Sequence, residues 1–211
     1  MVILIGNQKG GAGKSTIALL LANYLTQIRK RRVTVLDMDY QQSLFAKFEK
    51  AKILENIPLY EVVPADLADF PSMKRAMEGR RGEILLIDLP GKMDDDGLIP
   101  IFAAADMVIC PFSYDELSVD STVLFAMVLR TINERSPVVF LPNRIKNTVK
   151  YETRTEVENI MQRFGVVAPA LSDRVDFQRI STILTPLILM PVVLPVLDLI
   201  YDQYMQWEEL P

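Results

Sequence analysis

Residues 6–16, GNQKGGAGKST, hold the residue types that bind a phosphate group. Glycines let the backbone approach a ligand closely, so successive N–H groups can wrap around a phosphate. A helix that begins directly after such a loop adds positive potential from its N-terminus. The spacing therefore predicts a phosphate-binding loop formed by the backbone of Gly10, Gly11, Ala12 and Gly13.

Three side chains at the end of this loop complete the predicted nucleotide site. Lys14 is placed to reach the β- and γ-phosphates, Ser15 to ligate Mg²⁺ and Thr16 to bond another phosphate. The strict pattern G-x-x-x-x-G-K-[ST] is not met, because Gln8 stands where it has its first glycine. The alternative is a glycine-rich turn before a helix. The order of strand, glycines, lysine and hydroxyls favours the nucleotide site, and it leaves Lys9 with no phosphate of its own chain to bind.

Asp88, in the stretch DLPG at 88–91, is the predicted second element of the metal site. It ends a continuous apolar run, which is typical of a central parallel strand. An aspartate at this point holds Mg²⁺ in phosphate-loop enzymes, here through water, and Gly91 lets the next loop approach or leave the γ-phosphate. Strand-end aspartates also cap helices, but the glycine loop favours the metal. The acidic run 94–96 is interpreted as a solvated helix start.

Asp37 and Asp39 lie close together in LDMDYQQS, residues 36–43, at the end of another predicted strand. Paired carboxylates beside the metal of a nucleotide can orient a water molecule or order a switch loop. Capping of the next helix, by Asp39 or Ser43, fits the same pattern. We favour a catalytic or switch role for Asp39.

The elements that position these residues alternate between short β-branched runs and helical stretches, which predicts a doubly wound α/β fold with a mainly parallel sheet. In such folds the carboxyl ends of the strands meet at one edge, where ligands bind. The polar residues above, with Asn143 and Arg144, all follow predicted strands. Those strands cover 2–6, 32–39, 59–63, 83–90, 106–112 and 136–144, and the predicted helices cover 14–31, 41–51, 71–79, 117–133, 150–164 and 195–208.

The composition limits the classes of function. A chain of 211 residues, 50% of them hydrophobic, suits one domain over 1–211 with a sizeable core. A net charge of −4 gives no general attraction to nucleic acid or anionic lipid. Cys110 is the single cysteine and histidine is absent, which excludes a disulfide framework, an intrachain four-cysteine site and a histidine general base. The chemistry must rely on carboxylates, lysines, hydroxyls and a ligand-borne metal.

The apolar segment 183–200 has the length of a membrane-spanning helix. Pro186, Pro191 and Pro195 interrupt it, each costing a helix interior about 3 kcal/mol, and Asp198 adds a charge. We interpret it as a buried or interface-forming connection to the C-terminal helix, with no membrane partner. The apolar N-terminus is too short for a signal peptide, so we expect a cytoplasmic protein.

Three motifs together resemble the ParA/MinD family of deviant Walker A (phosphate-loop) ATPases. They are KGGAGKST at 9–16, LDMDYQQS at 36–43 and IDLPG at 87–91. PNR at 142–144 is similar to the adenine-contacting loop of the family, so the resemblance covers most of the chain and implies the P-loop NTPase fold. NQKGG is similar to the short, Soj-type ParA branch, of plasmid or conjugative-element kind, whereas the MinD branch has glycine where Gln8 stands.

The resemblance also implies roles for individual residues. Lys9 matches the signature lysine of the family, which crosses to the nucleotide of a second copy in an ATP-sandwich homodimer. Asp39 matches the aspartate that positions the attacking water, and Asn143 and Arg144 match the loop that contacts adenine. The implied function is weak hydrolysis of ATP with Mg²⁺, stimulated by a ParB-like partner. Such a switch partitions plasmids or chromosomes, or positions a transfer complex.

Three departures from the family pattern bear on these expectations. Tyr40 replaces the proline of the DPQ motif, and losing a residue of fixed φ can change the geometry of the switch loop. The chain opens directly on its first strand, so we expect no N-terminal DNA-reading extension. It ends on the acidic stretch LIYDQYMQWEELP, so we expect no basic amphipathic membrane anchor.

Basic residues in the C-terminal part bear on DNA as a partner, since short ParA proteins bind DNA without sequence specificity through such residues. The candidates are Arg144, Lys146, Lys150, Arg154, Arg163, Arg174 and Arg179. Glu152, Glu156 and Glu158 are interleaved with them, so an ordinary solvated helix with i,i+4 ion pairs fits equally well. The sequence leaves both interpretations open.

Two other classes of function fit the same loop. A metabolic ATP-dependent ligase or kinase of the dethiobiotin-synthetase kind needs a dedicated substrate pocket, which no motif marks. A nucleotide-holding adaptor without activity would be favoured by loss of Lys14 or Asp39, and both are present. A slow ATPase whose output is assembly is the preferred interpretation.

Overall fold

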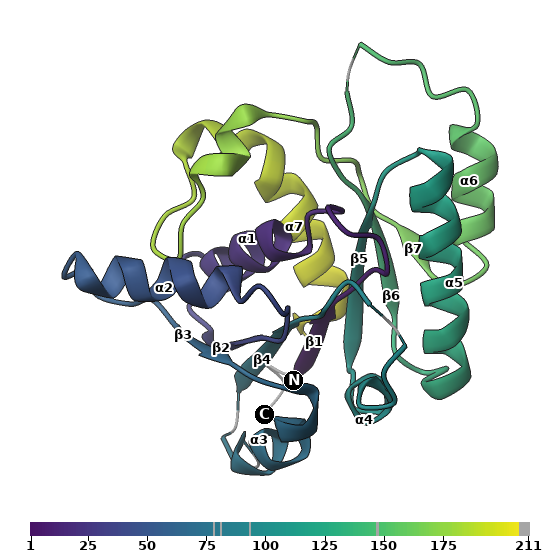
Figure 1. Ribbon diagram of the computed structural model, residues 1–211. Coiled ribbons are helices and arrows are strands. Elements are labelled where there is room, and N and C mark those ends of the chain that lie inside the picture. Colours follow the sequence, from purple (N-terminus) through teal and green to yellow (C-terminus); the bar gives the residue numbers. More distant parts are fainter. Residues whose placement is uncertain (78, 81, 93, 147, 207–211) are drawn as a thin grey trace.

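A parallel sheet of seven strands runs through the part of the chain that the structure describes (Figure 1). The structure is a computed structural model that describes residues 1–77, 79–80, 82–92, 94–146 and 148–206. The strand order is β3-β2-β4-β1-β5-β6-β7, which confirms the predicted doubly wound α/β fold. The strands are β1 (Val2–Ile5), β2 (Arg32–Asp37), β3 (Glu61–Pro64), β4 (Glu83–Asp88), β5 (Met107–Phe112), β6 (Val138–Pro142) and β7 (Val166–Val167).

Helices cover both faces of this sheet, because parallel strands are joined by crossover connections. One face is covered by α1, α2 and α7, and the other by α3, α4, α5 and α6 (Figure 1). The helices are α1 (Lys14–Gln27), α2 (Ser43–Ile53), α3 (Phe70–Met77), α4 (Leu98–Ala103), α5 (Glu116–Ile132), α6 (Arg154–Met161) and α7 (Met190–Tyr204), with short 3₁₀ helices η1 (Leu67–Asp69), η2 (Val175–Arg179) and η3 (Leu187–Leu189).

Strand β1 shows how the two cores are built. Side chains alternate across a strand, so Ile3 and Ile5 pack with α1 and α7 while Val2 and Leu4 pack with α4 and α5. Cys110 is a free thiol buried in the second core. The central strands are therefore buried on both sides, and their polar residues are confined to their ends.

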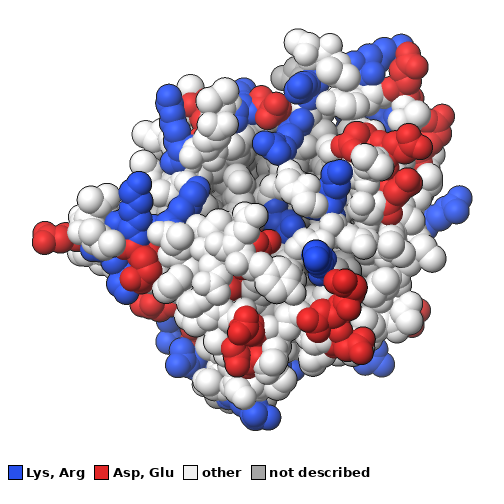
Figure 2. Space-filling view, viewed as in Figure 1, with Lys and Arg blue, Asp and Glu red and all other residues white. Residues whose placement is uncertain are grey.

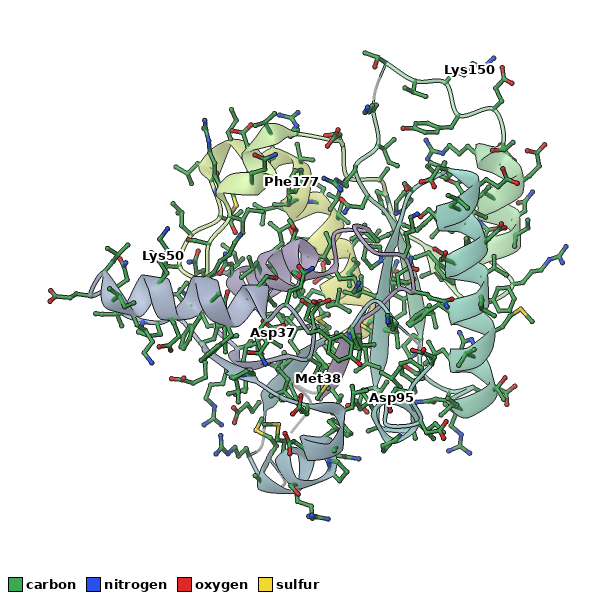
Figure 3. The ribbon with its side chains drawn as sticks, viewed as in Figure 1. Asp37, Met38, Lys50, Asp95, Lys150 and Phe177 are labelled. Atoms are coloured by element: carbon green, nitrogen blue, oxygen red, sulfur yellow. The ribbon has the colours of Figure 1, made fainter. Side chains whose placement is uncertain are left out.

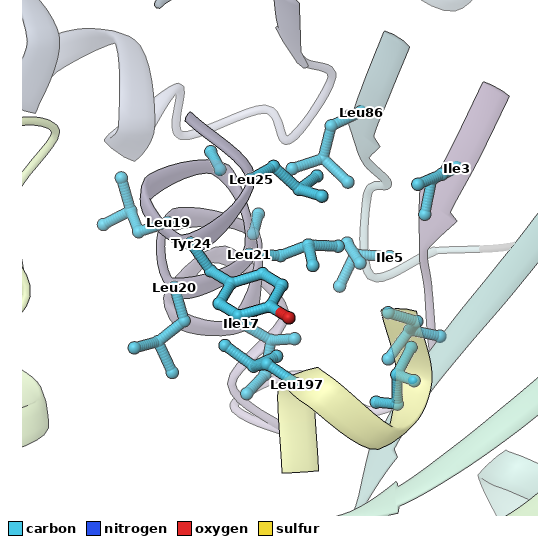
Figure 4. Packing of buried hydrophobic residues seen from close by; sticks show 14 of the residues in the cluster. Ile3, Ile5, Ile17, Leu19, Leu20, Leu21, Tyr24, Leu25, Leu86 and Leu197 are labelled. Carbon is cyan, nitrogen blue, oxygen red and sulfur yellow. The ribbon is translucent and has the colours of Figure 1, made fainter. Parts of the chain in front are cut away.

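Helix α1 fixes the position of the glycine loop. Figure 4 shows Leu21 and Leu25 directed at Ile5 and Leu86 of the sheet, with Leu197 of α7 on the other side. Full burial of such an aliphatic side chain contributes about 1.5–3 kcal/mol. This packing holds the first turn of α1 at the carboxyl end of β1.

Helix α7 begins earlier than the sequence predicted, at Met190 instead of near residue 195. Pro191 lies in the first turn, where a helix needs no N–H donor. Pro195 lies inside the helix and leaves the Pro191 carbonyl without its helical donor. Burial of Val196 and Leu197 in the first core stabilises the helix despite this loss. The prolines therefore shape the start of the helix and do not end it.

The stretch Leu187–Tyr204 is the one helical segment of the described chain that is long and apolar enough to cross a membrane. Its inner side packs in the first core through Val193 and Ile200. On another side Arg29, which follows the end of α1, forms an ion pair of 2.8 Å with Asp198. These contacts attach α7 to α1 and the sheet, in line with the predicted buried connection.

Candidate nucleotide-binding site

The loop between β1 and α1 requires glycine at two of its positions. Gly11 and Gly13 have φ angles of 76° and 94°, in the left-handed region that favours glycine. A Cβ on Gly13 would lie 2.3 Å from Asn143 Nδ2, so no side chain fits there. The N–H of Ile17 donates to the Gly13 carbonyl, so α1 starts directly at the loop. Its remaining N-terminal N–H groups are available to an anion.

Asn143 and Arg144, the predicted adenine contacts, lie against this loop. Asn143 Nδ2 donates to the Ala12 carbonyl at 2.9 Å, and Arg144 Nη1 donates to the Gly11 carbonyl at 3.0 Å. Asn143 N–H donates to the Phe112 carbonyl, which ties the β6 end to the β5 end. The structure thus brings both residues to the loop, where they hold its backbone. Their contact with adenine stays a prediction.

A cavity of about 730 Å³ opens over the loop at the carboxyl edge of the sheet. Its volume lies in the range of small-molecule sites. Among the predicted site residues it is lined by Gly10, Gly11, Gly13, Lys14, Ser15, Thr16, Asp39, Asn143 and Arg144. The rest of its lining is Gln41, Ser43, Gly91, Asp173, Arg174, Val175, Phe177 and Gln178. Three predicted residues, Lys9, Ala12 and Asp88, lie outside this lining.

Lys14 is buried, with 7% of its surface exposed, and its ammonium group lies beside Gly91. A Cβ on Gly91 would be 3.6 Å from Lys14 Nζ, so the glycine leaves room for the lysine. Lys14 also lies close enough to Asp88 to lower the pKa of that carboxyl. A cation this far removed from water needs anionic partners. A phosphate in the cavity would supply one.

Asp37, at the end of β2, caps helix α2. Its Oδ2 accepts hydrogen bonds from the N–H groups of Leu44 and Phe45, both at 2.9 Å. Burial raises the pKa of Asp37, and these N–H groups lower it. The alternative in which Asp39 or Ser43 caps this helix is therefore wrong. The first aspartate of the pair has the structural role, which leaves Asp39 on the cavity.

Asp88 is the register neighbour of Asp37 and has a different environment. It is fully buried, yet neither of its carboxylate oxygens has a well-formed hydrogen bond to any residue the structure describes. Burial raises the pKa of Asp88 to about 7, the Ser15 hydroxyl beside it lowers the pKa, and the charge of Asp37 raises it. Unpaired buried carboxylate oxygens are rare without an ion or water to complete them.

Magnesium fits this arrangement. Mg²⁺ is held by one or two carboxylates together with substrate phosphates and water, at sites without a full protein cage. The described residues contain no group of three or more acidic, cysteine or histidine side chains that would form such a cage. Ser15 lines the cavity, and the unpaired oxygens of Asp88 lie beside the Ser15 hydroxyl, behind the lining. Both residues offer hard oxygen ligands to the metal.

The loop after β2 presents Asp39 to the cavity. Asp39 Oδ1 accepts the N–H of Gln41 at 3.0 Å, and Gln42 has a φ of 47°, so the chain turns sharply before α2. Tyr40, the residue in place of the family proline, is 70% exposed. The loop therefore directs its carboxylate inward and leaves its aromatic ring in solvent.

Lys9 lies at the other end of the glycine loop. It is half-buried, and its N–H donates to Asn7 Oδ1 at 3.0 Å. It is absent from the lining of the cavity, in contrast to Lys14. The two lysines are thus separated by the loop itself.

The cavity wall opposite the loop was not predicted. It is formed by Asp173, Val175, Phe177 and Gln178, which belong to η2 and the turn before it. Figure 3 shows Phe177 on this segment, above α1, and Asp37 at the strand end below it. These residues follow the short strand β7 and carry no motif, so the sequence contained no signal for them.

Basic side chains surround the mouth of the cavity. Figure 2 shows Lys and Arg gathered around the hollow beside the η2 segment. Arg144 and Arg174 line the cavity, Lys146 borders a neighbouring groove with Arg174, and Lys150 lies on the loop after β6 (Figure 3). Arg179 lies nearby in η2 and forms an exposed pair with Asp176 at 3.3 Å.

Two of the predicted DNA-binding residues have other surroundings. Arg154 forms an i,i+4 ion pair of 2.8 Å with Glu158 and lies over the Tyr114 ring, as the solvated-helix alternative predicted. Arg163 follows α6 and borders a separate groove with Arg130. The basic rim of the cavity is therefore defined as Arg144, Lys146 and Arg174, while Lys150 lies further out on the loop after β6.

The strand order, together with a glycine loop between β1 and α1 beneath a cavity, defines a phosphate-loop nucleotide-binding fold. A family model described as the CobQ/CobB/MinD/ParA nucleotide binding domain matches residues 3–184. The chain belongs to this family, which confirms the resemblance to ParA/MinD ATPases. No curated protein sequence matches the chain significantly.

Several solved structures share the fold. A Borrelia burgdorferi B31 protein described as a plasmid partition protein, bound to AMPPNP, is 21% identical with a TM-score of 0.73, over 96% of this chain and 98% of that one. A Cyanothece McdA variant with one aspartate replaced by alanine, in complex with ATP, is 15% identical with a TM-score of 0.70, over 99% of this chain and 95% of that one. MinD in the Aquifex aeolicus MinC:MinD complex is 16% identical with a TM-score of 0.69, over 100% and 96%.

Proposed function

We propose that this chain is an ATP-driven molecular switch. Mg-ATP closes a dimer of two copies, hydrolysis opens it, and the cycle partitions or positions DNA or a DNA-associated complex in the cytoplasm. The observation that carries the proposal is the buried Lys14 at a glycine loop, next to the unpaired carboxylate of Asp88. Support comes from similar folds described as a plasmid partition protein bound to AMPPNP and as an ATP complex.

The proposed binding roles follow from the placement of each group. The backbone of residues 10–13 and the first turn of α1 bind the phosphates, and Lys14 neutralises their charge. Thr16 lines the same cavity and bonds a further phosphate oxygen. Ser15 and Asp88 hold Mg²⁺, Asp88 through water. When bound, the metal neutralises charge that develops on the phosphate oxygens.

The proposed hydrolytic role belongs to Asp39. Its carboxylate lies on the cavity, where it can accept a hydrogen bond from a water molecule and orient it toward the γ-phosphorus. Attack of that water breaks the bond to the bridging oxygen and yields ADP and phosphate. With histidine absent from the chain, the water is oriented by a carboxylate and not by an imidazole, and a slow reaction stimulated by a ParB-like partner fits this.

Dimer formation is proposed from the position of Lys9. Because Lys9 is outside the cavity of its own chain, it is available to the nucleotide of a second copy placed face to face. Such an arrangement is isologous, so each copy gives one lysine and receives one. ATP in both sites would then be required for a closed dimer.

The experiment that tests this function compares light scattering and ATP hydrolysis for the wild type, Asp39→Ala and a matched control, Asp120→Ala, which removes an exposed carboxylate from α5. We expect ATP-dependent dimers in all three and a dimer of Asp39→Ala that outlives the wild-type dimer at least about tenfold. Monomers of the wild type at saturating ATP would contradict the switch. Wild-type hydrolysis by Asp39→Ala would contradict the role of that residue.

Non-specific DNA binding is proposed for the basic rim. Each phosphate contact releases counterions, so the slope of log K against log salt should become shallower by about 0.9 per lost contact on duplex DNA. We expect Lys146→Ala and Arg174→Ala to reduce this slope on random DNA with ATP present, while Arg163→Ala leaves it unchanged. If all three variants had the same slope of log K against log salt as the wild type, the rim would bind no DNA.

A further inference from the structure

The buried amide of Asn7 links the Lys9 end of the loop to helix α5. Asn7 is completely buried. Its Nδ2 donates to the Pro111 carbonyl at the end of β5 and to Thr122 Oγ1 in α5, each at 2.8 Å. Its Oδ1 accepts the N–H of Lys9 at 3.0 Å. The hydrogen-bonding capacity of this one side chain is therefore shared between the sheet, α5 and the loop.

The chemistry of these partners fixes the orientation of the amide. The Pro111 carbonyl can only accept and the Lys9 N–H can only donate, so the reversed amide would face two like groups. The Thr122 hydroxyl donates its proton to the Ser118 carbonyl at 2.6 Å and is left as an acceptor for Asn7. A chain of defined donors and acceptors thus runs from the first turns of α5 to the backbone of Lys9.

An apolar contact next to this chain fixes the same two segments. A Cβ on Gly6 would lie 2.7 Å from Phe125 Cζ, so the ring of α5 rests directly on the backbone before Asn7. Phe125 is fully buried and stacks edge-on against Phe102 of α4. Helix α5 therefore holds the start of the loop both by packing and by hydrogen bonding.

We propose that Asn7 and Thr122 are positioning residues for Lys9. They fix the backbone of Lys9 so that its side chain stays out of its own cavity and meets the nucleotide of a second copy. This inference rests on the proposed dimeric switch and adds residues to it. Neither residue lines the cavity, so their loss should affect dimer formation and leave the affinity of the monomer for nucleotide unchanged.

The test uses three variants of α5. Thr122→Val keeps the shape of the side chain but removes the acceptor of Asn7, and Thr122→Ser restores a hydroxyl. Ser121→Ala is the matched control, because its hydroxyl also donates to a helix carbonyl, that of Leu117 at 2.7 Å, without a contact to the loop. Asn7→Ala is the stronger second variant. Thermal unfolding of each protein identifies any that fail to fold.

Two readouts separate this inference from the proposed function. The first is the hydrogen-exchange rate of the Lys9 amide in the nucleotide-free monomer, which needs no dimer. The second is dimer formation with AMPPNP, measured beside AMPPNP affinity. For Thr122→Val we expect amide exchange to rise about tenfold and dimer formation to weaken about tenfold. Affinity should stay within about twofold. Thr122→Ser and Ser121→Ala should behave as the wild type.

The outcomes are distinct. Unchanged exchange of the Lys9 amide in both Thr122→Val and Asn7→Ala would overturn the inference. Faster exchange with unchanged dimer formation would overturn it as well, because positioning would then have no consequence. If the wild type itself forms no AMPPNP-dependent dimer, the proposed function fails. The hydrogen-exchange rate of the Lys9 amide still decides whether Asn7 and Thr122 fix the backbone of Lys9.

Discussion

The two ends of the glycine loop, at Lys9 and at Lys14, are fixed by different parts of the molecule. The Lys14 end is held by α1 and by Asn143, and its ammonium group is buried on the cavity. The Lys9 end is held by Asn7, whose partners lie in β5 and α5, and it lies outside the cavity. One short segment therefore places two lysines in two environments.

This difference indicates that the two lysines bind different ligands. The buried ammonium group of Lys14, beside N–H groups and a buried carboxylate, needs an anionic ligand, which is the phosphate bound in the cavity of the same chain. A half-buried lysine outside that cavity has no such requirement, so its function can depend on a second copy. Variants at the two ends should therefore separate nucleotide binding from assembly.

The largest effect is expected at the Lys14 end. Lys14→Ala removes the charge that binds the β- and γ-phosphates, so ATP affinity should fall at least about 100-fold. Isothermal titration with ATP and Mg²⁺ measures it, and no dimer should form at accessible concentrations. Tight ATP binding by this variant would contradict the proposed difference between the two lysines, since the buried Lys14 would then have no part in binding the nucleotide.

The next effect is expected at the Lys9 end. For Lys9→Ala we expect ATP affinity within about twofold of the wild type and AMPPNP-dependent dimer formation at least about 30-fold weaker, because each copy loses a charged contact. Lys50→Ala removes an exposed lysine of α2 and is the matched control. Light scattering reads both. Dimers of Lys9→Ala at wild-type strength would show that the two ends do not differ in function.

The third prediction concerns Asp88, beside Lys14, and the dependence of stability on pH. Its pKa is raised from 3.8 to about 7, so the buried carboxyl stabilises the nucleotide-free fold while protonated and loses this contribution as pH rises through 7. Compared with Asp88→Asn, the wild type should lose about 2 kcal/mol of unfolding free energy between about pH 5.5 and about pH 7.5. Urea unfolding at the two pH values measures it. Parallel pH profiles of the two proteins would contradict the assignment.

The smallest effect is expected at Asn143. Asn143→Ala removes the hydrogen bond to the Ala12 carbonyl and frees the space in front of Gly13. The loop keeps its N–H groups, so ATP affinity should fall only about three- to fivefold. Titration with ATP reads this change. A loss as large as that of Lys14→Ala would show that Asn143 contributes as much to nucleotide binding as Lys14, and would contradict this ranking.

The fold and the phosphate end of the site were predictable because both depend on local patterns. The strand at 83–88 is a continuous apolar run that ends on a charged residue, and the glycine loop has its residues next to one another in the chain. Only the acidic start of helix α4, at 94–96, was predicted, because the six residues of the helix span less than two helical turns. Helix α7 was predicted to start too late, since a pattern rule treats Pro191 as a helix breaker although the first turn accepts it, and the predicted end at 208 lies outside the described residues.

The rest of the site depends on contacts that no local pattern records. Asp37 and Asp39 look alike in sequence, and only the position of α2 shows that Asp37 takes its N–H groups. Phe177 forms the far wall of the cavity because the segment after β7 folds back over α1. Asn7 precedes the loop motif, and its link to Thr122 appears only once α5 is packed against the sheet.

The central claim is that Lys9 serves the nucleotide of a second copy, and mixing two inactive variants tests it most directly. Lys9→Ala and Asp39→Ala are mixed before ATP is added, and phosphate release is measured. In a mixed dimer, the Lys9→Ala copy keeps its own Asp39 and receives Lys9 from its partner. A symmetric two-site dimer mixed at random predicts recovery up to about a quarter of the wild-type rate. A mixture as inactive as its components would contradict the claim, because Lys9 would then act within its own chain.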